Sequence, residues 1–233
     1  VDFLVDKLNT PFIKVASMDL NNYPFLEYIA KKGKPIVIST GLSNLNEIDR
    51  AIKTIEDAGN KQIVILHCVA TYPTPDKDVN LNNLNTLMSI YPNYPVGFSD
   101  HTMGSCIPLA AVALGACLLE KHFTLDQDME GWDHKISATK EEMKDIVINS
   151  KRISDALGSK RITVTESKEK ITEFRRSIVL VDNLKVGDII QEENITYKRP
   201  GTGITPGDLK HVIGKKLNQD LQADTLLKWE YLN

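Results

Sequence analysis

The sequence predicts an α/β fold in which part of a (β/α)8 TIM barrel is followed by a small, mostly β domain. Five short apolar runs alternate with longer helical patterns as far as about residue 158, which indicates parallel strands covered by helices. No run is followed by a GxGxxG glycine fingerprint, so a doubly wound dinucleotide-binding sheet is less favoured. Four of the runs end in polar side chains, as barrel strands do at the rim that carries an active site.

The five runs are rich in β-branched residues and suit strands that are buried on both faces of a parallel sheet. They cover residues 12–17, 35–40, 63–68, 95–100 and 117–124. Helices are predicted between and after them, over residues 21–33, 44–59, 81–90, 104–116 and 139–158. The second of these helices has apolar residues at helical spacing between an Asn at its start and Gly59 at its end, which are typical helix boundaries.

Five strand–helix units make about five-eighths of a barrel, so we expect three further units upstream of this sequence in a longer protein. The first residues, VDFLVDKLNTPF, contain no Met and look like part of an amphipathic helix. Residues 1–158 are therefore predicted to be the C-terminal five units of a catalytic barrel, and we expect them to be inactive without the rest.

The composition changes after residue 158. Residues 159–173 are polar and charged, which predicts a linker, and residues 174–233 are predicted to form the small domain. Strand-like runs in this domain are separated by glycine-containing turn signals, and a helical turn is expected near residues 207–214. The strand-like runs cover residues 177–181, 188–191, 195–198 and 226–232.

Charge and composition exclude some partners. The net charge is −3 with no clustered excess of Lys and Arg, which argues against nucleic-acid binding. No apolar stretch approaches the ~18 residues that a membrane span needs, so we expect a cytoplasmic protein without a membrane partner. Cys68, Cys106 and Cys117 lie in apolar surroundings, which predicts buried residues in a reducing compartment and no disulfide framework.

His101 and His122 follow neighbouring strands, and a barrel would bring both imidazoles to one rim. Two neutral imidazoles with several waters suit a divalent ion such as Mn²⁺, Zn²⁺ or Fe²⁺ acting as a Lewis acid. The alternative is two unrelated polar residues, one of them close to the start of a helix.

The same strand ends carry hydroxyl groups and one ammonium group. These groups suit a phosphate or a carboxylate, although Ser and Thr also cap helices throughout proteins. Lys14 is the most diagnostic, because a lysine inside an apolar strand is costly unless it is paired. The set consists of Lys14, Ser17, Ser39, Thr40 and Ser99.

Glu120, Lys121 and Asp133 are candidates for acid–base chemistry or for contacts with sugar hydroxyls, although a solvated loop also explains the EGWDHK stretch around Asp133. His67 lies inside an apolar run and is interpreted as a satisfied core histidine. For Asp100 we expect a local structural role.

Eight stretches of the chain together resemble the sialic acid synthases, a family that includes the legionaminic and pseudaminic acid synthases. They occur in the family's order and span nearly the whole sequence. They are KVASMDL, KPIVISTGL, LHCVATYPTP, VGFSDHT, EKHFTLD, DHKIS, FRRSI and RPGTGI. The resemblance implies a (β/α)8 barrel followed by an antifreeze-like (SAF) domain, in a domain-swapped homodimer whose SAF domain helps to close the partner's active site.

The resemblance also implies a transferase that joins phosphoenolpyruvate to an N-acetylmannosamine-type sugar and gives a nine-carbon ulosonic acid and phosphate. It assigns His101 and His122 to the metal, most often Mn²⁺, with Mg²⁺, Co²⁺ or Zn²⁺ as alternatives. With the two histidines, Glu120 would be catalytic. Phosphoenolpyruvate would bind Lys14, Ser17, Ser39 and Ser99, and the sugar would bind Tyr72, Asp133, Phe174 and Arg199.

Two positions depart from the family pattern. Trp132 stands where many relatives have a smaller residue or proline, and Ala70 replaces a polar side chain found in some members. Two alternatives remain open. One is another phosphoenolpyruvate–sugar synthase that makes octulosonate or heptulosonate phosphates, and the other is a non-catalytic sugar-binding relative.

Overall fold

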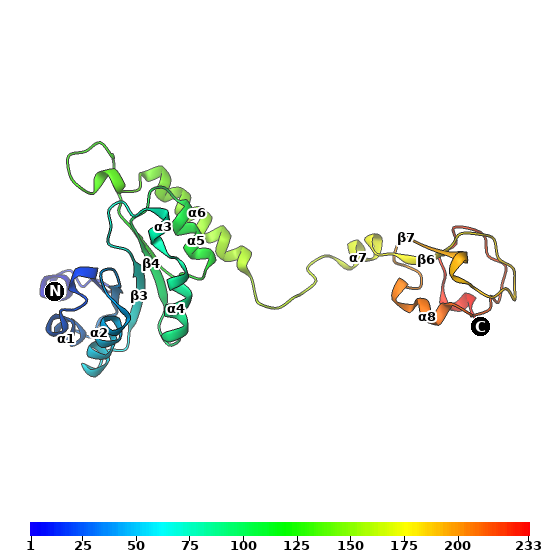
Figure 1. The fold of residues 1–233 in the computed structure, drawn as a ribbon, viewed down its shortest axis with the longest axis horizontal. Helices are drawn as coiled ribbons and strands as arrows, with labels where there is room; N and C mark the ends of the chain where they lie inside the picture. The colour runs from blue at the N-terminus through cyan, green and yellow to red at the C-terminus, as the bar shows by residue number, and fades with distance from the viewer. The chain divides into compact units, whose positions relative to one another are not determined.

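The computed structural model describes residues 1–233, which divide into two compact units, Val1–Ser159 and Lys160–Asn233 (Figure 1). In the first unit five parallel strands pair in the order in which they occur along the chain, as expected for half of a barrel. They are β1 (Ile13–Val15), β2 (Ile36–Ser39), β3 (Ile63–Cys68), β4 (Val96–Asp100) and β5 (Leu119–Lys121). The five predicted strands are confirmed. The last one is shorter than predicted, because beyond it Phe123 makes only an isolated bridge to Ala138.

Helices lie between and after these strands, close to the predicted positions. They are α1 (Tyr23–Ala30), α2 (Leu45–Asp57), α4 (Asn82–Ile90), α5 (Cys106–Ala113) and α6 (Lys140–Leu157). Asn44 and Thr139 begin α2 and α6 with capping boxes, in which each side chain accepts a hydrogen bond from the backbone three residues on. A short helix, α3 (Asp76–Val79), was not predicted, and 3-10 turns occupy Ser17–Asp19 and His134–Ile136.

The amphipathic helix predicted at the start of the chain is wrong, because the helical segment there is much shorter than predicted. The structure has a five-residue π-helical turn there, Phe3–Lys7, and none of its residues is buried. An amphipathic helix is stabilised by burying its apolar face, and in this segment only Val5 packs, half-buried, against the core.

The two faces of the sheet differ in character. Ile13, Ile36, Ile65 and Phe98 belong to a hydrophobic core that they share with the helices. Because side chains alternate along a strand, the residues between them point to the opposite face. That face carries the polar residues Lys14, Ser39, Ser99 and Glu120 together with Cys68.

Gly97 of β4 lies too close to its neighbours for a side chain to fit without a shift. A Cβ atom there would lie 2.4 Å from the Leu118 carbonyl oxygen and 2.7 Å from Leu66 Cδ2. We expect Gly97→Ala to lower the free energy of unfolding by about 1–3 kcal/mol through overpacking, measured by denaturant unfolding. Gly207→Ala is the control, since its nearest neighbour would be at 3.5 Å. Equal stability of the two variants would contradict this explanation.

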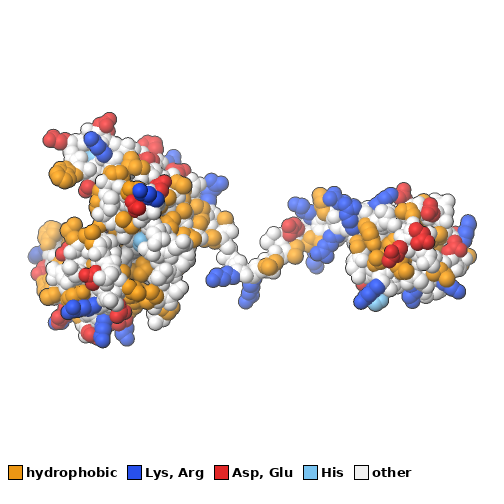
Figure 2. All heavy atoms as spheres, in the orientation of Figure 1, with side chains coloured by type: hydrophobic (Ala, Val, Ile, Leu, Met, Phe, Trp, Pro, Cys, Tyr) orange, Lys and Arg blue, Asp and Glu red, His pale blue; other side chains and the backbone are white.

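The edges of the sheet are open, because β1 and β5 each pair with a strand on one side only. Phe12 and Phe123, beside these edge strands, are exposed, and Figure 2 shows hydrophobic side chains over a broad area of the first unit. Cys68 is buried as predicted, but the predicted burial of Cys106 and Cys117 is wrong. Cys106 opens the first turn of α5 and Cys117 precedes the edge strand β5, so neither is covered by another element.

The second unit contains an antiparallel pair, β6 (Ser177–Leu180) and β7 (Ile195–Lys198), over its own core. The predicted strands 188–191 and 226–232 are wrong, since they form only isolated bridges. The reason is that 3-10 turns, Glu192–Asn194 and Trp229–Tyr231, interrupt the extended chain, and a third turn occupies Pro206–Asp208. The predicted helical turn is confirmed as α8 (Leu209–Val212), and α7 (Lys168–Phe174) lies across the end of the predicted linker. No helix in either unit has both the length and the apolar character needed to cross a bilayer.

Candidate functional site

A pocket of about 950 Å³ lies at the carboxyl ends of the five parallel strands. It brings together residues predicted to bind metal, phosphoenolpyruvate and sugar, although they come from segments up to 119 residues apart. Its predicted site residues are Lys14, Ser17, Ser39, Tyr72, Ser99, His101, Glu120, His122 and Asp133. We call it the rim pocket.

One side of the rim pocket suits an anion. The Ser39 hydroxyl is buried and has no hydrogen-bond partner within the protein, which is costly unless a ligand supplies one. The Lys14 ammonium donates to its neighbour's carbonyl oxygen, Val15 O, at 2.8 Å and lies 3.5 Å from Glu120 Oε1. A cation and a hydroxyl with unused hydrogen-bonding capacity are what a phosphate or carboxylate requires.

The loop after β2 is held close to this anion side. At Gly41 a Cβ atom would lie 2.7 Å from Ser17 Oγ and 3.2 Å from Ala70 Cβ. Only glycine allows this approach without moving Ser17, whose hydroxyl is also 3.5 Å from the Cys68 thiol.

Glu120 connects the anion side to the rest of the pocket. Its Oε1 accepts a hydrogen bond from the buried Ser99 hydroxyl at 2.8 Å and faces the Lys14 ammonium. The side chain is 39% exposed, so the carboxylate is oriented by two partners and still reaches solvent.

The two predicted metal ligands lie side by side, with ring centroids 5.2 Å apart. His101 Nδ1 is 2.9 Å from the Val69 carbonyl oxygen, and His122 Nδ1 is 3.6 Å from Asp133 Oδ2. The Val69 carbonyl oxygen can accept a hydrogen bond only from a protonated Nδ1, which leaves His101 Nε2 able to ligate a metal. The Asp133 carboxylate is too far from His122 Nδ1 for a hydrogen bond, but it faces the same ring nitrogen. The chain has no cluster of three or more His, Cys, Asp or Glu side chains placed to hold a metal. The donors therefore fit an ion with two protein ligands, whose other positions would be filled by water or substrate.

Tyr72 covers the two imidazoles. Its ring centroid is 4.1 Å from that of His101 and 5.8 Å from that of His122, in the latter case edge to face. Burial raises the pKa of the Tyr72 hydroxyl, and the nearby carboxylates of Asp133 and Glu120 raise it further. The phenol therefore remains a hydrogen-bond donor across the neutral range.

The structure corrects two predictions about polar residues. Lys121 does not reach the rim pocket, because its side chain is buried and its ammonium is paired with Asp100 Oδ2 at 2.6 Å. Thr40 is not on the anion side, because its hydroxyl donates to the Leu66 carbonyl oxygen. The prediction for His67 is confirmed, since its Nε2 lies 2.7 Å from the Val79 carbonyl oxygen and burial lowers its pKa.

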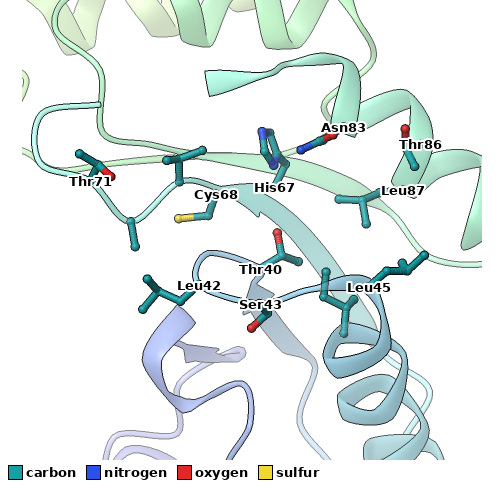
Figure 3. Close-up of a pocket in the computed structure, with 13 residues that line it drawn as sticks. Thr40, Leu42, Ser43, Leu45, His67, Cys68, Thr71, Asn83, Thr86 and Leu87 are labelled. Atoms are coloured by element: carbon teal, nitrogen blue, oxygen red, sulfur yellow. The ribbon is translucent and has the colours of Figure 1, made fainter. Parts of the chain in front are cut away.

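A second cavity of about 410 Å³ adjoins the rim pocket and shares Leu42, Cys68 and Ala70 with it. Figure 3 shows Leu45 of α2 and Leu87 of α4 on either side of this cavity. Since Thr40 and His67 in its wall already have backbone partners, we assign the chemistry to the rim pocket.

The remaining predicted residues, Phe174 and Arg199, belong to the second unit. The Arg199 guanidinium lies over the Phe174 ring, 4.8 Å from its centroid, which is a cation–π contact. The aromatic ring therefore orients a guanidinium that keeps its hydrogen-bond donors.

One contact in the rim pocket had no signal in the sequence. The Cys68 thiol lies 3.8 Å from His101 Nδ1, although the two residues are 33 positions apart. Only the pairing of β3 with β4 brings them together.

Comparison with known proteins decides the family. Residues 1–162 match the NeuB family, and residues 175–233 match the SAF domain. The chain belongs to the NeuB family, the sialic acid synthases. The resemblance seen in the sequence is thereby confirmed, as is the SAF domain.

Relatives of this NeuB chain include an uncharacterized protein of Methanocaldococcus jannaschii, 46% identical over 98% of the chain and 68% of that protein. The N,N'-diacetyllegionaminic acid synthase of Legionella pneumophila is 39% identical over the whole chain and 66% of its own length. Among solved structures, the sialic acid synthetase of Leptospira borgpetersenii in complex with citrate gives a TM-score of 0.66 at 35% identity, covering 71% of this chain and 57% of that one. The NeuB chain thus spans about two thirds of the length of the curated relatives that it matches.

Proposed function

We propose that the protein carrying this chain condenses phosphoenolpyruvate with an N-acetylmannosamine-type sugar in the cytoplasm. The products would be a nine-carbon ulosonic acid and phosphate, and the reaction would depend on a divalent metal. The observation that carries the proposal is the rim pocket, in which an unpartnered hydroxyl and an ammonium lie beside two imidazoles.

His101 and His122 would hold the metal through their Nε2 atoms. We propose Mn²⁺, with Mg²⁺, Co²⁺ or Zn²⁺ as alternatives. When bound, the ion would act as a Lewis acid that polarises the sugar aldehyde.

Lys14, Ser17, Ser39 and Ser99 would bind the phosphate and carboxylate groups of phosphoenolpyruvate. Its C3 would attack the aldehyde carbon to form the new C–C bond as the C=O π bond breaks, and the resulting alkoxide would take a proton from solvent water. Water would add at C2, with Glu120 accepting its proton, and the tetrahedral product would then lose phosphate. The Lys14 ammonium has three donors and could hold both Glu120 and the anion, whereas the Ser99 hydroxyl has one proton and would have to turn from Glu120 to donate to phosphoenolpyruvate.

On the sugar side we propose Asp133 and Tyr72 from the rim pocket, and Arg199 with Phe174 from the SAF domain. A guanidinium suits sugar hydroxyls, because it offers several donors in a fixed plane. In a domain-swapped homodimer, the SAF domain of one protomer would serve the pocket of its partner. A monomer measured by light scattering at assay concentrations would contradict this arrangement.

We also propose that three further strand–helix units complete the barrel. The unpaired edges of β1 and β5, with Phe12 and Phe123 exposed beside them, support this proposal. An open parallel edge with apolar side chains is an association hazard that closure of a barrel removes.

The test is phosphate release from phosphoenolpyruvate with a panel of N-acetylmannosamine-type sugars, with and without Mn²⁺. We expect sugar-dependent and metal-dependent release from a protein with all eight units, and none from residues 1–233 alone. Robust turnover by residues 1–233 would contradict the missing-unit proposal. Release with only pentose or tetrose phosphates would favour an octulosonate or heptulosonate synthase, and sugar binding without release would favour the non-catalytic alternative.

A further inference from the structure

Asp100 and Lys121 form an ion pair that no proposed binding or catalytic step uses. The Lys121 ammonium lies 2.6 Å from Asp100 Oδ2, and the exposed fractions of the two side chains are 3% for Lys121 and 0% for Asp100. The residues face each other across β4 and β5 in the register of the sheet. Each one directly precedes a proposed metal ligand, His101 or His122.

Two more hydrogen bonds join the ion pair to the backbone of Thr102, which follows β4. Asp100 Oδ1 accepts from the Thr102 amide at 2.8 Å, and the Lys121 ammonium donates to the Thr102 carbonyl oxygen at 2.6 Å. Together with the ion pair, these bonds anchor the residues on both sides of His101 to the end of β5.

The alternation of side chains makes this anchoring relevant to the pocket. Asp100 and Lys121 point to the helix-covered side of the sheet, and the residues that follow them line the rim pocket. The Asp100–Lys121 pair therefore fixes the ends of β4 and β5, and this limits the movement of the His101 and His122 imidazoles that follow. A site with only two protein ligands has no third ligand to compensate if the spacing of the imidazoles changes.

The energetics favour a geometric role over a stabilising one. A fully buried ion pair contributes little to stability compared with apolar residues of the same volume, because both charges must be desolvated. We propose that the Asp100–Lys121 pair is a positioning device that holds His101 and His122 at the spacing one metal ion requires. This inference rests on the proposed metal site.

The test uses the intact protein and the variants Asp100→Asn, Lys121→Met and their combination. The dissociation constant of Mn²⁺ is measured from the electron paramagnetic resonance signal of the free ion, and the unfolding midpoint is measured in parallel. We expect each single variant to bind Mn²⁺ about 10–100-fold more weakly, the range typical for loss of groups that orient metal ligands. The double variant is expected to be no weaker than the weaker single variant, because either change alone breaks the anchor.

Leu84→Ala is the control, because Leu84 is fully buried in the core and does not line the rim pocket. It should lower the unfolding midpoint and leave the Mn²⁺ affinity within about twofold, since a core cavity destabilises without touching the ligands. Wild-type Mn²⁺ affinity in the Asp100→Asn and Lys121→Met variants would overturn this inference and leave the proposed metal site standing. An equal loss of Mn²⁺ affinity in Leu84→Ala would do the same. A wild-type protein that does not bind Mn²⁺ would overturn the proposed metal site together with it.

Discussion

Replacing His101 by alanine in the intact protein should lower the rate of sugar-dependent phosphate release by about 10³-fold. The change removes one of the two imidazoles that would hold the metal, and loss of Lewis-acid catalysis costs several kcal/mol of transition-state stabilisation. Each 1.36 kcal/mol corresponds to a factor of about ten in rate. The measurement is phosphate release at saturating Mn²⁺, together with the dissociation constant of Mn²⁺.

His211→Ala is the matched control for this substitution. His211 lies in the second unit with its side chain exposed, so both turnover and Mn²⁺ affinity should remain at wild-type values. His101 is buried and its ring contacts Tyr72, so the unfolding midpoint is also compared. Turnover by a folded His101→Ala variant within tenfold of wild type would remove His101 from the metal site.

Replacing Glu120 by glutamine is expected to lower kcat by about 10²–10⁴-fold, the usual contribution of general acid–base catalysis. An amide oxygen can still accept the hydrogen bond from Ser99, so the side chain should keep its place. The amide cannot take a proton from the attacking water. It also removes the negative charge that faces the Lys14 ammonium at 3.5 Å, so the ammonium is freer to bind an anion. The KM for phosphoenolpyruvate should therefore be unchanged or lower.

This separation of kcat from KM distinguishes a catalytic role from a structural one. Glu141→Gln serves as the control, because Glu141 is exposed in the first turn of α6 and its substitution should change neither constant. The Mn²⁺ affinity of Glu120→Gln should equal that of the wild type. A raised KM with an unchanged kcat would show that Glu120 binds substrate and does not act on the water.

Much of the fold could be predicted, because the signals that define it are local. The strand at residues 63–68 is a run of apolar residues, and the helix from Leu45 to Asp57 has apolar residues at helical spacing between a capping Asn and a Gly. The secondary structure of the second unit is less predictable from the sequence. Its short runs look like strands, but 3-10 turns interrupt two of them, and only β6 and β7 form a ladder. The SAF domain was identified from its motifs and not from periodicity.

The candidate site could also be predicted only in part from the sequence. Polar residues at the ends of apolar runs are visible in the sequence, and so are the motifs that identify the family. The sequence could not separate the roles of neighbouring residues, since it predicts both Glu120 and Lys121 at the rim and indicates only a local structural role for Asp100. The structure places Glu120 in the rim pocket and buries Lys121 against Asp100.

By itself, the sequence determined the five strands of the first unit, the helices that lie between and after them, the polar strand ends and the family. Only the tertiary structure decided which polar group faces the pocket and which is buried, and which thiol touches His101. The physical reason is strand register. Ser99 lies opposite Glu120 and Asp100 lies opposite Lys121, and a slip of one residue would exchange the two faces of the strand. Register depends on packing between segments about 20 residues apart, which no local pattern in the chain specifies.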